Sequence, residues 1–209
     1  MSYPNLETIC GKMTKRFSEL NEGRDKVLKT QREVIRCASL SIRAIHRGEF
    51  ELAETLLREA SERFKEIKDI LERFGELYYS GYLLDSQKEF AEAHITYALV
   101  KNLPLPDPDD LKVEHSSYMN GMGEAIGELR RFLLDKIRHD DFDDGERILD
   151  IMDELYCALT SMDFPDAITR GLRRTTDIAR SIIEKTRGDL TQNLSQKRLI
   201  SKISVLEKN

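Results

Sequence analysis

The sequence predicts an all-α protein that forms one helical domain over residues 1–209. Of its 209 residues, 34% are charged and 40% are hydrophobic, and the chain contains only 5 Pro, 11 Gly and no Trp. This composition is typical of a soluble helical protein. Apolar residues recur at helical spacing through most of the chain, and no segment alternates between apolar and polar residues as a β-strand would.

The first expected helix extends from about Asn5 to Arg47, with Gly23 as a possible break. Apolar side chains of its second half share one side, at Val27, Leu28, Val34, Ile35, Ala38, Ile42 and Ile45. Cations lie within roughly 60° of one another on the opposite side, at Lys29, Arg32, Arg36, Arg43 and Arg47. Residues 24–47 contain seven Lys or Arg against two Asp or Glu, a local charge of +5. Such a surface would match a phosphate backbone, although an ordinary solvated helix face is the alternative.

Glycine, proline and acidic turns mark the ends of the other expected helices. Gly48 and Gly75 are expected to end the first and second helices, and the Pro-rich segment 103–110 is expected to be a loop. Gly188-Asp189 is expected to end the sixth helix, and residues 190–209 then form a seventh helix or a loose tail. The expected helices after the first are 49–74, 75–102, 115–139, 145–161 and about 163–187.

The cysteines indicate a cytoplasmic protein. Cys10, Cys37 and Cys157 are far apart and form no CxxC pair, so we expect reduced, buried thiols. No apolar run approaches the ~20 residues of a membrane span, and the N-terminus lacks the pattern of a signal peptide. Because the formal charge is −5, a polyanionic partner would need a local basic surface.

Two pairs of glutamates have helical spacing. Glu124 and Glu128 are four residues apart, and Glu89 and Glu92 are three apart, so each pair shares one face of its helix. If the two helices pack together, four carboxylates converge. Small residues at 123 and 127, both glycine, would let a neighbouring helix approach. Solvated helix faces are the alternative interpretation of these glutamates.

Clustered carboxylate oxygens are hard ligands that suit Mg²⁺ or Mn²⁺, which could activate water for attack on a phosphodiester. A di-iron site is a competing interpretation, but it would need Glu-x-x-His motifs. No histidine has a glutamate three residues before it; the four are His46, His94, His115 and His139. Tyr78, Tyr79 and Tyr82 could stack on bases, although at helical spacing such residues are more often part of a core.

Three segments resemble the translin family, and within it the branch of translin-associated factor X. Residues 21–34, followed by 41–47 with the terminal His-Arg, resemble the basic first helix of the family. Glu-Phe-Ala-Glu-Ala at 89–93 resembles the segment Glu-Tyr-x-Glu-Ala. Residues 118–131 resemble Tyr-Leu-x-Gly-x-x-Asp-Leu-x-Gly-Glu-Leu-x-Arg. The three segments occur in the same order and spacing as in the family.

This resemblance implies a seven-helix protomer that assembles into a hollow homo-oligomer, commonly an octamer, and binds single-stranded RNA or DNA. It further implies a metal-dependent endoribonuclease. The implied catalytic and metal-binding carboxylates are Glu89, Glu92, Glu124 and Glu128. Glu124 departs from the pattern, because the catalytic branch has Asp there; the side chain is one methylene longer, and Mg²⁺ demands near-ideal octahedral geometry.

We therefore expect a homo-oligomeric endoribonuclease that uses Mg²⁺ or Mn²⁺ and acts on single-stranded RNA. In this interpretation the four glutamates hold the metal and its water, and the cations of the first helix guide the phosphate backbone. A protein that binds single-stranded nucleic acid without catalysis is the first alternative. A helical scaffold that binds no nucleic acid is the second.

Overall fold

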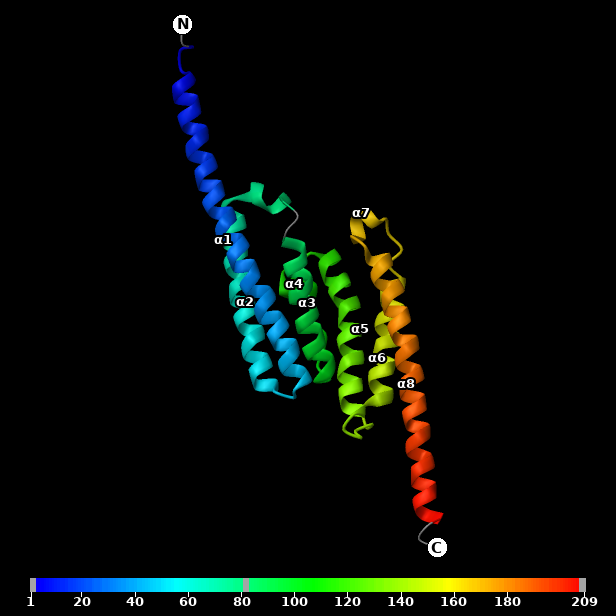
Figure 1. Cartoon of the computed structure of the whole chain (residues 1–209). Helices are drawn as coiled ribbons and strands as arrows, with labels where there is room; N and C mark the ends of the chain where they lie inside the picture. The colour runs from blue at the N-terminus through cyan, green and yellow to red at the C-terminus, as the bar shows by residue number, and fades with distance from the viewer. Residues whose placement is uncertain (1–2, 81–82, 207–209) are drawn as a thin grey trace.

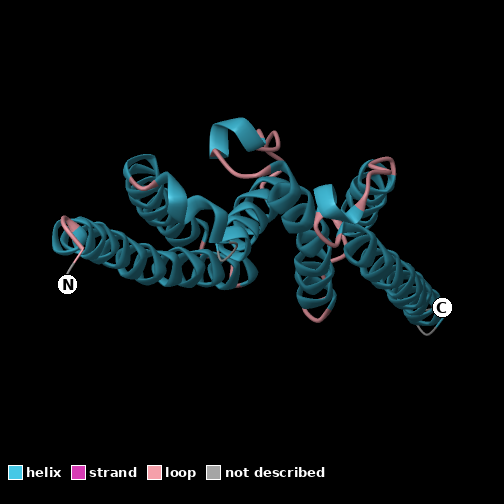
Figure 2. Ribbon diagram, turned by 90° about the horizontal axis from the view of Figure 1, so that it is seen from above, coloured by secondary structure: helices cyan, strands magenta, loops and turns pink. Residues whose placement is uncertain are grey.

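The computed structural model describes residues 3–80 and 83–206, and this part of the chain is helical with no β-strand (Figures 1 and 2). The all-α prediction is confirmed. The elements are α1 (Leu6–His46), α2 (Phe50–Arg73), the 3₁₀ helix η1 (Gly75–Ser80), α3 (Leu83–Val100), α4 (Pro108–Leu111), α5 (His115–Ile137), α6 (Gly145–Thr160), α7 (Asp166–Thr169) and α8 (Leu172–Leu206).

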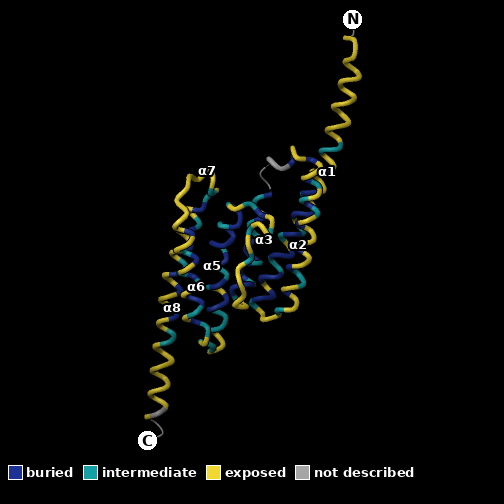
Figure 3. The backbone as a smooth tube through the Cα atoms, turned by 180° about the vertical axis from the view of Figure 1, so that it is seen from behind, coloured by how far each residue is buried: buried dark blue, intermediate teal, exposed yellow. Residues whose placement is uncertain are grey.

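The long helices pack side by side. Helix α1 contacts α2 and α3, α3 contacts α5, and α5 contacts both α6 and α8. Buried apolar residues from all six long helices form the main core, among them Val27, Phe64, Phe90, Leu129 and Met152. Figure 3 shows the buried residues in the middle of the molecule and the exposed ends of α1 and α8, which project in opposite directions.

Helix α1 continues through Gly23, so the break considered there is absent. Gly23 is buried, and a Cβ atom at this position would lie 3.0 Å from Phe74 Cδ2 and 3.4 Å from Leu77 Cδ1. The missing side chain therefore makes room for residues that follow α2. Phe74 and Leu77 are three residues apart, and Leu77 N donates to Phe74 O (2.9 Å) as in a 3₁₀ turn, so both side chains face Gly23.

The third helix differs from its predicted bounds. It begins at Leu83 rather than at Gly75, and η1 occupies residues 75–80. The 3₁₀ turn holds Leu77 beside Phe74, and both side chains lie against Gly23 of α1. The side chains of Tyr78 and Tyr79, and all of Tyr82, lie outside the described residues.

The proline-rich loop is shorter than predicted because its last residues form α4. The side chain of Asp107 accepts a hydrogen bond from Asp109 N (2.8 Å), and Pro108 occupies the first helical position. Pro165 likewise precedes a single helical turn, α7, and not the long helix predicted there. Arg170 and Gly171 have φ angles of 51° and 89° and turn the chain into α8.

Helix α8 does not end at Gly188-Asp189, which corrects the prediction. Arg130 of α5 donates to Asp189 (2.8 Å) and to Thr186 Oγ1 (3.1 Å), on both sides of the glycine. Leu190 is buried against Gly145 of α6. Glycine costs about 1 kcal/mol relative to alanine in a helix, and these contacts offset that cost. The chain is therefore helical up to Leu206 rather than a loose tail.

The cysteines are partly different from the prediction. Cys37 is buried, but Cys10 and Cys157 are exposed, so the expectation of three buried thiols is wrong for two of them. Among the described helices, none combines the length and the apolar character needed to cross a bilayer.

Candidate metal and nucleic-acid site

The packing of α3 against α5 brings three of the four predicted glutamates together, and Gly121 makes this contact possible. A Cβ atom at Gly121 would lie 2.7 Å from the carbonyl oxygen of Lys88 and 3.0 Å from the amide nitrogen of Glu92. These are backbone atoms of α3, so only glycine permits this approach. Glu124 is one turn further along α5 and consequently lies opposite Glu89 and Glu92.

The glycines predicted to allow this contact have a different role. A Cβ atom at Gly123 would meet Thr175 Cγ2 at 2.2 Å, and one at Gly127 would lie 3.8 Å from Ile182 Cδ1. Both neighbours belong to α8. Gly123 therefore allows α8, and not the helix with the other glutamates, to approach α5.

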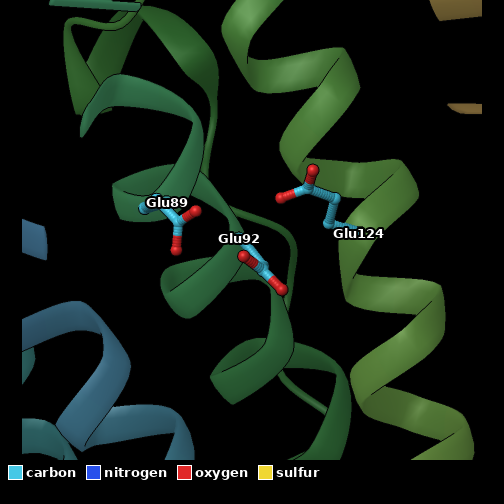
Figure 4. Close-up of side chains that lie close together, drawn as sticks. All are labelled: Glu89, Glu92 and Glu124. Carbon is cyan, nitrogen blue, oxygen red and sulfur yellow. The ribbon is translucent and has the colours of Figure 1, made fainter. Parts of the chain in front are cut away.

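Three carboxylates form one cluster, which we call the carboxylate cluster: Glu89 and Glu92 of α3 and Glu124 of α5. Each offers an oxygen atom, and these three oxygens lie within 4.8 Å of one another. Figure 4 shows Glu124 pointing toward the helix that carries Glu89 and Glu92. Glu92 is only 7% exposed, whereas the side chains of Glu89 and Glu124 are 33% and 38% exposed. The cluster is thus buried at one end and open to solvent at the other.

One cation, Lys88, touches the carboxylate cluster. Its Nζ donates to Glu124 Oε1 (2.7 Å) and lies 4.0 Å from Glu89 Oε1. Burial opposes the charge on Lys88, but the hydrogen bond and the attraction of Glu124 outweigh this effect and raise the pKa of Lys88. In the described part of the chain, one positive charge faces three acidic groups, and this shortage of positive charge favours binding of a second cation.

The electrostatics of the cluster keep a proton on Glu92. Burial, followed by repulsion from Glu124 and Glu89, raises the pKa of Glu92 to about 9. Burial and the charge of Glu124 also raise the pKa of Glu89. At neutral pH and without a bound cation, Glu92 is therefore protonated, and a cation would take the place of that proton.

Glu128, the fourth predicted carboxylate, is outside this group of three. Its Oε2 lies 2.5 Å from Nε2 of His46, the last residue of α1. The His46 side chain is only 4% exposed, and its buried Nδ1 has no hydrogen-bond partner among the residues that the structure describes. Glu128 is still near enough for its charge to contribute to the raised pKa of Glu92. It is an adjacent group that α1 holds in place.

Sequence reasoning did not identify His46 and Lys88 as parts of this site. The resemblance of His46-Arg47 to the terminal His-Arg of the family was the available signal for the first. For Lys88 the signal was its position four residues before Glu92, on the same helix face.

The predicted cations of α1 are exposed. Lys29, Arg32, Arg36 and Arg43, here called the α1 cation row, form no ion pair within the described ranges 3–80 and 83–206. Arg47 differs, since it donates two hydrogen bonds to Glu49 (2.8 and 2.9 Å). An ordinary solvated helix face would mix charges and form i,i+4 pairs. The row is thus available to an external polyanion, and its helix ends at the histidine that contacts Glu128.

The chain is similar to solved structures of C3PO proteins. AfC3PO, determined in complex with duplex RNA, is 32% identical to it with a TM-score of 0.83, over 90% of this chain and 97% of that one. A second match, the crystal structure of AfC3PO, has the same values. NeC3PO without ligand is 19% identical with a TM-score of 0.81, over 92% of this chain and 99% of that one, which establishes the similarity of fold alone.

A curated protein also matches over most of its length. An uncharacterized protein of Methanocaldococcus jannaschii is 33% identical over 187 residues, which are 87% of this chain and 82% of that protein. No protein-family profile matches the chain.

Proposed function

Because the C3PO proteins belong to the translin family, this chain is a member of that family, and from that premise we propose that it is an RNA-binding endoribonuclease of the translin-associated factor X type. The proposed reaction is hydrolysis of single-stranded RNA with Mg²⁺ or Mn²⁺. One observation carries the proposal: Glu89, Glu92 and Glu124 offer three oxygens within 4.8 Å of one another. The exposed α1 cation row supports it further.

The residues of the cluster fit a hard divalent cation. All three donors are carboxylate oxygens, the ligand type that Mg²⁺ and Mn²⁺ prefer. The raised pKa of Glu92 supports the fit, because the fold buries this carboxylate and holds it beside Glu124 and Glu89 with little positive charge to balance them. When bound, such an ion lowers the pKa of a water ligand and polarises a phosphoryl oxygen.

The remaining polar residues would orient the reactants. Lys88 holds Glu124 Oε1, and its charge offsets part of the repulsion between the cluster and an incoming phosphate. His46 fixes Oε2 of Glu128, so that the other carboxylate oxygen can accept a hydrogen bond from the attacking water. In this proposal Glu128 is a positioning group beside the metal and not one of its ligands, which revises its expected role.

The longer side chain at position 124 is compatible with this function. Glu124 offers an oxygen within 4.8 Å of those of Glu89 and Glu92, even though the catalytic branch has Asp at this position. The methylene that Glu adds therefore does not remove the carboxylate from the site. We propose that the metal site is retained.

RNA is the proposed nucleic-acid ligand because AfC3PO, which is 32% identical, was determined in complex with duplex RNA. The α1 cation row would contact the phosphate backbone without reading bases. Binding of DNA and a preference for single strands are parts of the proposal, to be measured with matched DNA, single-stranded and duplex ligands.

We further propose assembly into a homo-oligomer, an octamer as in the family. Exposed apolar side chains on the projecting ends of α1 and α8 support such assembly: Leu6, Ile9, Met13, Phe17, Leu199, Ile203 and Leu206. A cytoplasmic location, where the thiols stay reduced, completes the proposal.

A non-catalytic binding protein is the second candidate. The ion pair between Lys88 and Glu124 favours it, because that contact uses an oxygen that a metal would need. In that case the protein would retard RNA without cutting it, and the α1 cation row would be its main functional feature.

The deciding experiment is cleavage of end-labelled single-stranded RNA with Mn²⁺ by the wild type, Glu92→Gln and Glu124→Gln. Glu154→Gln is the matched control, since Glu154 is exposed on α6. We expect the wild type to cleave the RNA and EDTA to stop this cleavage. The cleavage rate should fall at least a hundredfold in each cluster variant and stay unchanged in the control. Cleavage that survives EDTA or both cluster substitutions would refute the mechanism, and retardation without cleavage would favour the binding protein.

A further inference from the structure

A pocket of about 540 Å³ lies beside the carboxylate cluster, between α3, α5 and the start of α8. Its charged lining residues are Asp85, Lys88 and Glu124, together with Arg170 and Arg174. Figure 1 shows α7 and the beginning of α8 next to the first turns of α5. The pocket therefore shares Glu124 with the carboxylate cluster and adds two cations from a different part of the chain.

The wall that carries Arg170 is anchored to the same helix as Glu124. Asn120 is buried one turn before Glu124, and its Nδ2 donates to the carbonyl oxygen of Thr169 (2.9 Å). Its Oδ1 accepts a hydrogen bond from Thr175 Oγ1 (2.7 Å) on α8. These contacts hold the turn at Arg170 at a defined position relative to Glu124.

The two arginines have no internal role in the described part of the chain. Both are exposed, and neither forms an ion pair with a residue in the ranges 3–80 and 83–206. The backbone at Arg170 has a φ of 51°, a conformation that non-glycine residues adopt uncommonly. Guanidinium groups bind phosphate oxygens through two parallel hydrogen bonds, which distinguishes them from lysine.

The size of the pocket limits its ligand. Its volume lies within the roughly 300–1,000 Å³ of small-ligand sites, which is enough for one nucleotide but not for a duplex. Arg170 and Arg174 lie at the turn before α8 and in its first turn, whereas Glu89 and Glu92 of the carboxylate cluster lie on α3. A phosphate bound there would be separate from a phosphate positioned at Glu124.

We propose that Arg170 and Arg174 bind the phosphate that neighbours the scissile phosphodiester, and that the pocket holds the nucleotide between these two phosphates. This inference rests on the proposed nuclease function and deepens it. The α1 cation row binds the strand at any register, whereas this subsite sets which linkage lies at the carboxylate cluster.

The first test measures binding without catalysis. Uridine 3′,5′-bisphosphate is titrated calorimetrically into the metal-free full-length protein, into Arg170→Asn/Arg174→Ala and into Arg173→Ala. Asparagine at position 170 tolerates the positive φ, so the loss of charge does not add backbone strain. Arg173 is the matched control because it is exposed on the same helix but lines a different pocket. We expect binding to weaken at least about tenfold in the double variant, as for loss of a charge-assisted contact, and to be unchanged in the control.

The second test uses RNA that carries a neutral methylphosphonate at the linkage next to the cleaved one. In the wild type this substitution should raise KM, because Arg170 and Arg174 lose the phosphate charge that they bind. In the double variant it should raise KM no further, because the two arginines that bind this charge are already absent. Bisphosphate binding that needs the two arginines supports the subsite even if the protein cuts no RNA. RNA cleavage with unchanged KM in the double variant, together with unchanged bisphosphate binding, would overturn the subsite and leave the proposed function intact.

Discussion

Replacing Glu92 by Gln should remove a specific pH dependence from the stability of the metal-free protein. The pKa of Glu92 is raised from 4.5 to about 9 in the folded chain, mainly by burial and then by repulsion from Glu124 and Glu89. Between these two pH values the folded protein keeps the proton and the unfolded chain releases it. Because the unfolded state then binds fewer protons, the free energy of unfolding must fall as the pH rises through this window.

The magnitude follows from one proton. A full proton difference corresponds to about 1.4 kcal/mol per pH unit, so from pH 6 to pH 8 the wild type should lose roughly 2–3 kcal/mol relative to the variant. For a chain of this size, 1 kcal/mol shifts Tm by about 2–4 °C. The expected relative change in Tm is therefore roughly 4–12 °C over these two pH units.

Thermal unfolding in EDTA at a fixed protein concentration, from pH 5.5 to pH 8.5, measures this effect. Glu154→Gln is the control, since an exposed glutamate ionises alike in both states. The difference between the wild type and the Glu92 variant should grow with pH, and Mn²⁺ should stabilise the wild type more at high pH than at low pH. Parallel pH profiles for the two proteins would refute the assignment of the buried proton to Glu92.

Three further predictions concern the frame of the site. Gly121→Ala should abolish Mn²⁺ binding and destabilise the fold by about 1–3 kcal/mol, because its Cβ would meet the backbone of α3 at 2.7 Å. The control is Gly188→Ala, whose Cβ would lie in open space and which should stabilise the fold by up to about 1 kcal/mol. Alanine substitution of the α1 cation row should reduce the slope of log K against log salt for single-stranded RNA by about 0.7 per lost phosphate contact. His46→Asn should lower kcat more than Mn²⁺ affinity, since Glu128 would lose its anchor.

Each of these predictions has a contradicting result. Unchanged Mn²⁺ affinity in the Gly121 variant, measured by calorimetry next to the Gly188 control, would disprove the role of close helix packing. A salt slope that stays constant when the row is neutralised would exclude the row from the RNA interface. Equal losses of Mn²⁺ affinity and kcat in the His46 variant would make Glu128 a metal ligand rather than a positioning group.

The helices and the glutamate pairs were predictable because they depend on local spacing. The apolar positions of α1 and α2 recur at helical intervals, and Glu89 and Glu92 share a face for the same reason. The break at Gly188 was wrong because the contacts that hold α8 there come from Arg130 and Gly145, which are distant in the chain. Local propensity yields to such tertiary contacts.

The details of the site depended on contacts that spacing does not reveal. Gly121, Gly123 and Gly127 are close in sequence, but which of them faces α3 depends on how α5 is rotated in the bundle. The separation of Glu128 from the cluster results from a histidine 82 residues away. The glutamates were predicted to converge if their two helices packed together, and α3 does pack against α5.

The most direct test of the central claim is anomalous diffraction from crystals soaked in Mn²⁺. The claim predicts an anomalous peak in contact with Glu89, Glu92 and Glu124, with Lys88 Nζ displaced from Glu124 and the His46–Glu128 contact intact. Crystals in which Mn²⁺ fully occupies other sites but gives no anomalous peak at the carboxylate cluster would contradict it.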